Sequence, residues 1–399
     1  MNIFKNKLVL ASPLIALAII FIFSLTLFPS VQPQPKNLPI AIVNEDQGVQ
    51  IPDQPKMNMG ETLLEKIQTM SKSNTDEDAA VKWIEVKSTE AVQKGLDNQE
   101  YYAALVIPED FSAKQASLRT SEPTSPEVEI YINQGMNTMA ATAAGQMVNG
   151  IVDNMNNSVR AQLLDEFEKQ GVTLSPKQVS SLVNPMTKNV TNVNEIGTNS
   201  ANGNAPVSLF QPLWMASMAS AAIIYLAVSK LSASNRKEKL SAKFFQILIG
   251  AAVALVVGFG LTWMAEGLIG FTIPDMTDTA FFLSLTSFSF YLMISSILSL
   301  IGLKGMPLFV LMLFFGAPLL AMAPEMMSSF YRDWFYSWLP MRFMVEGLRE
   351  LFFFGKGLTW SSSVATLVWI GLGSMLVILS TALKPSAGGE AKPQASIEG

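Results

Sequence analysis

The sequence PMRFMVEGLRELFFF, residues 340–354, combines charged and aromatic side chains in a pattern that could serve a functional site. The candidate residues are Pro340, Arg342, Glu346, Arg349 and Glu350. On a helix that starts at Pro340, the four charged residues are spaced i, i+4, i+7 and i+8 and lie on one face. Such a ladder could form the outer gate of a pathway for solutes. The alternative is an anchor at the membrane surface, where Trp and Tyr gather in any case.

A second candidate is the basic segment 231–243, which contains Arg236, Lys237, Glu238 and Lys239. Short charged loops of this kind can dock a cytoplasmic partner. The alternative is that these residues only supply the excess of Lys and Arg typical of cytoplasmic loops.

Composition excludes several classes of chemistry. The chain has no Cys and no His, so it cannot contain a disulfide, a thiolate metal site or a Ser-His-Asp triad. No phosphate-binding loop of the type G-x-x-x-x-G-K-[ST] occurs. We therefore expect no catalytic, cofactor or metal site, and any ATP would be hydrolysed by another chain. No basic patch indicates nucleic acid as a partner.

Long apolar stretches predict membrane spans, because a hydrocarbon core of roughly 30 Å needs about 20 apolar residues. Six stretches qualify: residues 8–28, 209–228, 244–264, 281–301, 306–323 and 364–383. The first could also be a cleaved signal peptide, but its apolar run is long for one. The prediction is a polytopic α-helical protein with one span at the start and five in the last half, in contact with membrane lipids.

Flanking charges predict the orientation of these spans. When the spans alternate in direction, the basic residues of the flanks all fall on one side of the membrane. These are Lys5, Lys7, Lys304, Lys384 and the basic residues of the segment 231–243. Both termini are therefore expected in the cytoplasm, and we expect the protein in a bacterial cell membrane as a multi-pass protein. The last outer loop, residues 324–360, has balanced charge and reads as a re-entrant element.

The predicted domains follow from this layout. They are an anchor at residues 1–29, an extracytoplasmic domain at 30–207, a five-helix membrane domain at 208–384 that includes the element 324–360, and a cytoplasmic tail at 385–399.

The extracytoplasmic domain is expected to have two parts. Residues 30–133 alternate strand and helix patterns, which predicts an α/β fold with about four strands; the expected strands are 38–44, 81–87, 101–107 and 127–133. Residues 134–207 are expected to form a long helix, a short helix that starts at Ser175–Pro176, and an exposed linker over 184–206.

Three stretches resemble a known family. LPIAIVNEDQG carries Asn44, Glu45, Asp46 and Gly48; STEAVQKGLDNQEYYAALVIPEDFS carries Ile107, Pro108 and Phe111; and LPMRFMVEGLRELFFFG carries Pro340, Glu346, Leu348 and Arg349. In this order and spacing they are similar to type-2 ABC transporter permeases, and among these to the YhgE/Pip-like group, which is related to phage infection protein.

This resemblance implies a permease subunit of an ABC-type exporter for a hydrophobic or amphipathic compound such as a lipid, peptide or drug. It also implies a separate cytoplasmic nucleotide-binding ATPase subunit, docked near Arg236–Lys239, and a homodimer or a heterodimer with a second permease. Unlike many such permeases, the chain has too short a start, MNIFKNK, for an amphipathic helix before the first span. The alternative is a membrane-anchored surface receptor or secretion accessory protein that acts through its outer domain.

Overall fold

The computed structural model describes all residues except 1–6, 26–32, 51–54, 72–78, 232–234 and 384–399. Its contacts divide the chain into two compact units. The first contains Met1–Ser208, Ile269–Asp275 and Phe314–Gly357, and the second contains Leu209–Leu268, Met276–Leu313 and Leu358–Gly399.

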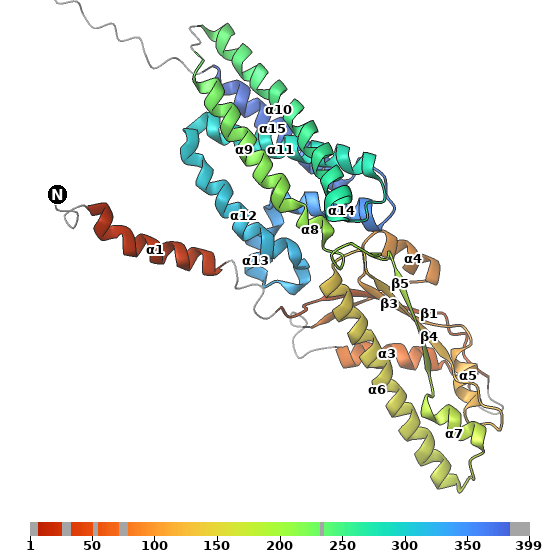
Figure 1. Ribbon diagram of the computed structural model, residues 1–399. Helices are drawn as coiled ribbons and strands as arrows, with labels where there is room; N and C mark the ends of the chain where they lie inside the picture. Colours follow the sequence, from red (N-terminus) through yellow and green to blue (C-terminus); the bar gives the residue numbers. More distant parts are fainter. Residues whose placement is uncertain (1–6, 26–32, 51–54, 72–78, 232–234, 384–399) are drawn as a thin grey trace, which may run out of the picture. The chain divides into compact units, whose positions relative to one another are not determined.

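A five-stranded mixed sheet forms the centre of the first unit (Figure 1). The strands are β1 (Leu38–Asn44), β2 (Val81–Glu85), β3 (Ala103–Ile107), β4 (Glu127–Asn133) and β5 (Thr187–Val193). They lie in the order β2-β1-β3-β4-β5, and every neighbouring pair is parallel except β3 and β4. The α/β pattern expected for residues 30–133 is confirmed in its four strands.

Strand β5 corrects the prediction for residues 184–206, which were expected to be a linker. Its sequence TKNVTNV is polar, and most of its side chains are exposed because it lies at the edge of the sheet. An edge strand of this kind lacks the alternation of apolar and polar residues that identifies a half-buried strand. Seven main-chain register pairs with β4 hold it instead.

Helices cover both faces of this sheet. Helix α4 (Thr89–Asp97) packs Val92 and Leu96 against Ala41 and Val106 on one face. Since side chains alternate along a strand, Ile40 and its register partners point to the other face. Helix α6 (Thr138–Gln170) lies on that face, where a Cβ on Gly145 would come within 2.7 Å of Ile132 Cδ1.

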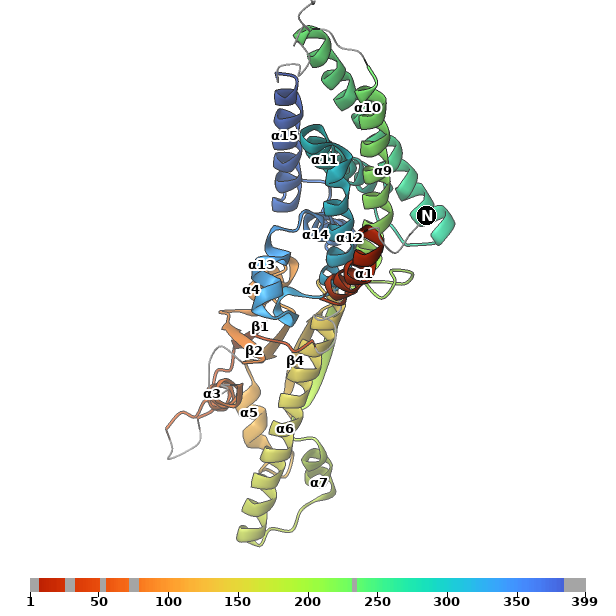
Figure 2. The ribbon, with the colours of Figure 1, turned by 90° about the vertical axis from the view of Figure 1, so that its left-hand side faces the viewer.

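The far end of α6 has its own small core. Leu163 and Phe167 of α6 pack with Leu118 and with Leu182 of α7 (Pro176–Val183). Figure 2 shows α7 beside the end of α6. Helix α7 begins as expected, with Ser175 as N-cap in a reciprocal capping box.

The remaining elements of the first unit include α1 (Lys7–Leu25), α3 (Met59–Ser71), α5 (Phe111–Ser117) and α8 (Ala205–Ser208). The segment 314–357 adds η5 (Pro324–Met326), α13 (Ser329–Trp334), η6 (Tyr336–Trp338) and α14 (Pro340–Phe353). The predicted domains assign residues 324–360 to the membrane domain, whereas the contacts group residues 314–357 with the sheet. Helix α14 begins at Pro340, as its N-terminal proline indicates.

The second unit is a bundle of apolar helices. It contains α9 (Phe210–Ser229), α10 (Arg236–Met264), α11 (Met276–Ile301), the start of α12 (Met306–Ala321) and α15 (Ser362–Thr381), with the π-helical turn η3 (Ala265–Ile269) after α10 and the 3-10 turn η4 (Gly302–Gly305) after α11. Helix α11 packs against α9, α10 and α15. Gly250 and Gly258 of α10 permit a close approach, because a Cβ at either position would collide with Tyr291 or Ser284 of α11.

Among the described residues, four helical stretches are long and apolar enough to cross a membrane. They are Ala205–Ser229, Arg236–Ile269, Met276–Ala321 and Ser362–Thr381, which supports the expectation of a membrane protein. The predicted span 281–301 and residues 306–321 of the next predicted span fall in the third stretch, which η4 interrupts. The count of six stays a prediction. Residues 26–28 of the first predicted span, Lys5 and the tail 385–399 lie outside the described residues.

Candidate functional site

Helix α14 brings together three of the four charged residues predicted to form a ladder. Arg342 Nε lies 3.8 Å from Glu346 Oε1, as the i, i+4 spacing predicts. Arg349 is buried, with 9% of its surface exposed, and interacts electrostatically with Glu346. Pro340 occupies the first turn, and Glu350 accepts a main-chain hydrogen bond of 3.3 Å from Lys356 N.

Arg349 belongs to a polar group that we call the arginine cluster: the buried Tyr102, Tyr336 and Arg349 and the partly buried Glu325 and Glu346. Tyr102, directly before β3, donates a hydrogen bond of 2.9 Å to Glu325 Oε2. Arg349 interacts electrostatically with Tyr102 and Tyr336, and both tyrosines are buried. The cluster therefore connects the sheet with the segment 314–357.

Burial shapes the proton affinities in the arginine cluster. It lowers the pKa of the Arg349 guanidinium and raises the pKa of Tyr336. Burial also raises the pKa of Tyr102 well above its ordinary value, and the Glu325 carboxylate adds to this effect. Both phenols are thus protonated at neutral pH, so that Tyr102 can donate to Glu325.

The guanidinium of Arg349 has unused hydrogen-bonding capacity. Its Nε and Nη2 are buried and find no hydrogen-bond acceptor among the described residues. A buried cation in this state is costly. Arg342 Nε also finds no hydrogen-bond acceptor among the described residues, but the Arg342 guanidinium carbon lies over the rings of Tyr336 and Phe343, at 5.4 and 4.6 Å from their centroids.

Two further hydrogen bonds join the segment 314–357 to the sheet and to α6. Lys36 N, just before β1, donates to Glu325 O at 2.8 Å. Asn137 Nδ2, at the N-cap of α6, donates to Ala321 O at the end of α12, at 3.0 Å. Glu325 thus binds the sheet through both its main chain and its side chain.

Sequence reasoning missed Tyr102, Glu325 and Tyr336. Tyr102 lies in one of the stretches that resemble the permease family, but as the residue before a buried strand it reads as part of the core. Glu325 follows Tyr102 by 223 residues, and no spacing rule connects positions so far apart.

The motif Asn44-Glu45-Asp46-x-Gly48 has a different role, because Asp46 joins two helix N-termini. Its Oδ1 accepts from Gly48 N at 3.2 Å and from Ser112 N at 2.9 Å. Its Oδ2 accepts from Gly60 N at 3.0 Å and from Ser112 Oγ. Gly60 lies at the start of α3 and Ser112 at the start of α5, where a carboxylate also complements the helix dipole.

Glu45 does the same for α4. Its Oε1 accepts hydrogen bonds from Thr89 N at 2.8 Å and Thr89 Oγ1 at 2.9 Å. Asn44 Oδ1 accepts from Asp46 N at 3.1 Å and fixes the turn. Ligands of open α/β sheets commonly bind at the carboxyl ends of parallel strands. Here the protein's own carboxylates occupy that edge after β1, so the motif is structural.

The predicted docking residues do not form a loop, which corrects that part of the prediction for 231–243. Arg236, Lys237, Glu238 and Lys239 form the first turn of α10. Asn235 caps it, accepting from Glu238 N at 2.9 Å and donating to Glu238 Oε1 at 2.9 Å. An Asn before a Glu three residues later is a helix start signal. Residues 232–234 lie outside the described part of the chain.

Lys239 of this turn lines a cavity of about 310 Å³ in the second unit, together with Lys243 and Ser299. Lys243 Nζ donates to Ser299 Oγ at 3.0 Å, which fixes its position at the wall. This end of the bundle therefore presents positive charge.

Comparison with known proteins identifies the family. The family described as protein of unknown function DUF3533 matches residues 12–359, and the chain belongs to this family. The uncharacterized protein YhgE of Bacillus subtilis (strain 168) is 26% identical over 132 residues, which is 33% of this chain. The chain spans only 15% of the length of that relative. No solved structure matches.

Proposed function

We propose that this member of the DUF3533 family is the permease subunit of an ABC-type exporter, which moves a hydrophobic or amphipathic compound across a bacterial cell membrane. Energy would come from ATP hydrolysed by a separate cytoplasmic subunit. Two permease subunits, identical or different, would form the membrane part. Four long apolar helices and the resemblance of three sequence stretches to type-2 permeases support this proposal.

The observation that carries the proposal is the arginine cluster. It fixes α14 to the sheet, and α14 is followed within a few residues by the apolar helix α15. A buried, incompletely bonded Arg349 at this position is more than an aromatic anchor requires. It fits an outer gate whose closed state depends on contacts with Tyr102 and Glu325.

The proposed topology has six spans and both termini in the cytoplasm, with the sheet outside. The positions of Lys and Arg support it. Cytoplasmic Lys304 and the first turn of α10 would then lie on one side of the membrane, and the sheet on the other.

The ATPase subunit would dock on the first turn of α10. Purification from native membranes in mild detergent tests this, with the copurified nucleotide-binding subunit quantified by mass spectrometry. We expect recovery of a stoichiometric ATPase, which the double variant Arg236→Glu, Lys237→Glu abolishes. The control Lys230→Glu should retain it. Absence of any nucleotide-binding subunit would contradict the proposal.

The second candidate is a surface receptor or secretion accessory protein. The observation that favours it is the independent core of the first unit, with apolar side chains buried on both faces of the sheet. Deletion of residues 32–205 distinguishes the two functions. A receptor should lose all activity, whereas an exporter subunit should still recover its ATPase.

A further inference from the structure

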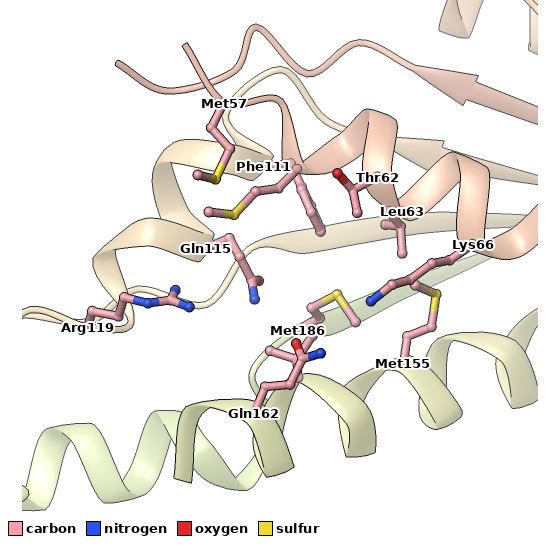
Figure 3. A pocket seen from close by; sticks show the side chains of 12 residues that line it. Met57, Thr62, Leu63, Lys66, Phe111, Gln115, Arg119, Met155, Gln162 and Met186 are labelled. Carbon is pink, nitrogen blue, oxygen red and sulfur yellow. The ribbon is translucent and has the colours of Figure 1, made fainter. Parts of the chain in front are cut away.

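A cavity of about 230 Å³ lies in the first unit among α3, α5 and α6 (Figure 3). Its lining includes four methionines: Met57, Met59, Met155 and Met186. The cavity is open to solvent on one side, and its volume would hold about eight water molecules, at about 30 Å³ each.

The wall combines apolar and polar side chains, and its apolar part is adaptable. Met155, Met186 and Phe111 are buried, whereas Met57 is 38% exposed at the opening. Methionine is unbranched and polarisable, and surfaces rich in it bind varied apolar chains. A methylene group is similar in size to a water molecule, so the cavity fits a chain of about eight carbons.

One of the polar side chains that line this space is buried. Gln115 is 7% exposed, and Figure 3 shows its carboxamide directed into the cavity. Its Oε1 finds no hydrogen-bond donor among the described residues. Since a buried acceptor without a donor costs roughly 1–3 kcal/mol, an N–H or O–H of a bound molecule would stabilise the site.

The charged residues of the lining are both cations. They are Lys66 and Arg119, and no acidic side chain of the described residues contributes to the wall. Arg119 is paired with Glu166, with its Nε 3.0 Å from Glu166 Oε2. Lys66 is exposed on α3, and its ammonium points toward the cavity in Figure 3. The opening thus favours a negative group near Lys66.

We propose that this methionine pocket binds a single-chain anionic amphiphile. Its chain of about eight carbons would lie among the four methionines, a hydrogen-bond donor would meet Gln115 Oε1, and its negative group would meet Lys66. An N-acyl amino acid combines these three features. The proposal does not depend on export, because it concerns the first unit alone.

Nuclear magnetic resonance of the full-length chain in lipid nanodiscs tests the proposal, with methionine methyl groups labelled with ¹³C. The probe is N-octanoylglycine, and Met155→Leu and Met186→Leu assign the two resonances. We expect saturable shifts at Met155 and Met186 and none at Met139, which is exposed on α6 and does not line the pocket. Unsaturable shifts, or equal shifts at all methionines, would show partitioning into lipid and overturn the proposal.

Two compounds related to N-octanoylglycine test its amide N–H and its negative charge separately. Octanoate lacks the amide N–H, and octanoyl ethanolamide lacks the charge. Octanoyl ethanolamide should bind about fivefold more weakly, as expected for the loss of one exposed charge contact. Octanoate should bind about tenfold more weakly, because it leaves the buried Gln115 Oε1 without a donor. A neutral blocked tetraleucine peptide that binds more tightly than N-octanoylglycine would overturn the choice of ligand.

Variants locate these contacts on the protein. Lys66→Glu should weaken N-octanoylglycine about fivefold, whereas Lys94→Glu on α4, on the opposite face of the sheet, should leave its affinity unchanged. Gln115→Leu should make N-octanoylglycine and octanoate bind alike. If that variant does not fold, Val159→Phe should abolish binding by filling the cavity. Unchanged affinity in Val159→Phe with an intact spectrum would refute the site.

Discussion

Tyr102 and Glu325 are 223 residues apart in sequence, yet the phenol donates a hydrogen bond of 2.9 Å to the carboxylate. Tyr102 precedes a buried strand, and Glu325 begins the segment that leads to α14. This bond connects the sheet to the segment 314–357, which contains the predicted gate residues. We therefore expect the arginine cluster to hold the segment 314–357 against the sheet.

Tyr102→Phe should loosen the segment 314–357. Hydrogen bonds to charged groups contribute about 1.5–3 kcal/mol, so amide hydrogen exchange in α14 should accelerate about tenfold or more. Mass spectrometry of the full-length chain measures this exchange. The matched control is Tyr131→Phe, whose hydroxyl donates to Glu129 on the sheet, at 2.6 Å. Equal exchange of α14 in both variants would contradict the role of Tyr102.

Arg349→Met should separate folding from function. The substitution removes the desolvation cost of a buried cation but also its attraction to Glu346, and because these two effects oppose each other, thermal stability should change by no more than about 3 kcal/mol. Efflux should nevertheless fall at least about tenfold if the charge operates a gate. Lys356→Met, which alters a partly exposed cation after α14, should retain efflux. Full efflux in Arg349→Met would contradict the gate and favour the alternative, an anchor at the membrane surface.

High pH should destabilise the first unit through the tyrosines of the arginine cluster. Burial raises the pKa of Tyr102 and Tyr336 in the folded state. The corresponding stability is complete below the unfolded pKa of about 10 and is lost as pH rises toward the folded values. Thermal unfolding should therefore occur at lower temperature above about pH 10. In Tyr102→Phe this decline should be shallower, because fewer protons are released on unfolding; an identical decline would argue against burial of Tyr102.

Asp46→Ala should destabilise the contacts between the carboxyl end of β1 and the helices α3 and α5. It removes the acceptor for Gly60 N and Ser112 N, which belong to α3 and α5. Loss of a buried carboxylate that holds several donors should cost roughly 3 kcal/mol or more. Limited proteolysis of the full chain should show faster cleavage. Asp97→Ala, which removes an exposed acceptor for Gln93 Nε2, should not; similar cleavage of both variants would contradict the account of the motif.

Gly250→Ala tests the packing of the second unit. An added Cβ would collide with the ring of Tyr291, whose hydroxyl donates to Gln246 O at 2.8 Å. We expect a loss of about 1–3 kcal/mol in thermal stability in detergent. Gly260→Ala on the same helix meets open space and should be neutral or slightly stabilising. The reverse order of stabilities would disprove the close approach of α10 and α11.

Local signals in the sequence predicted much of the first unit. The four strands, the N-cap Ser175 and the start of α14 at Pro340 all depend on residues within a few positions of each other. Strand β5 could not be predicted in this way, because its stability comes from pairing with β4 rather than from its own apolar pattern.

The candidate site was only half predictable. Helical spacing placed Arg342, Glu346 and Arg349 on one face, but their partners Tyr102 and Tyr336 come from other elements. The methionine pocket has no linear motif at all, since its walls come from α3, α5, α6 and the residue before β5. Tertiary packing alone assembles such sites.

Transport by inside-out membrane vesicles from the native host tests the central proposal most directly. A fluorescent amphiphile and ATP would be added to the medium outside the vesicles. Uptake would be compared among vesicles from three strains: wild type, a deletion of the gene, and the Arg349→Met variant. We expect ATP-dependent uptake in the wild type and its loss in the deletion and in Arg349→Met. Equal uptake in all three strains, for lipid, peptide and drug probes alike, would contradict the assignment as an exporter subunit.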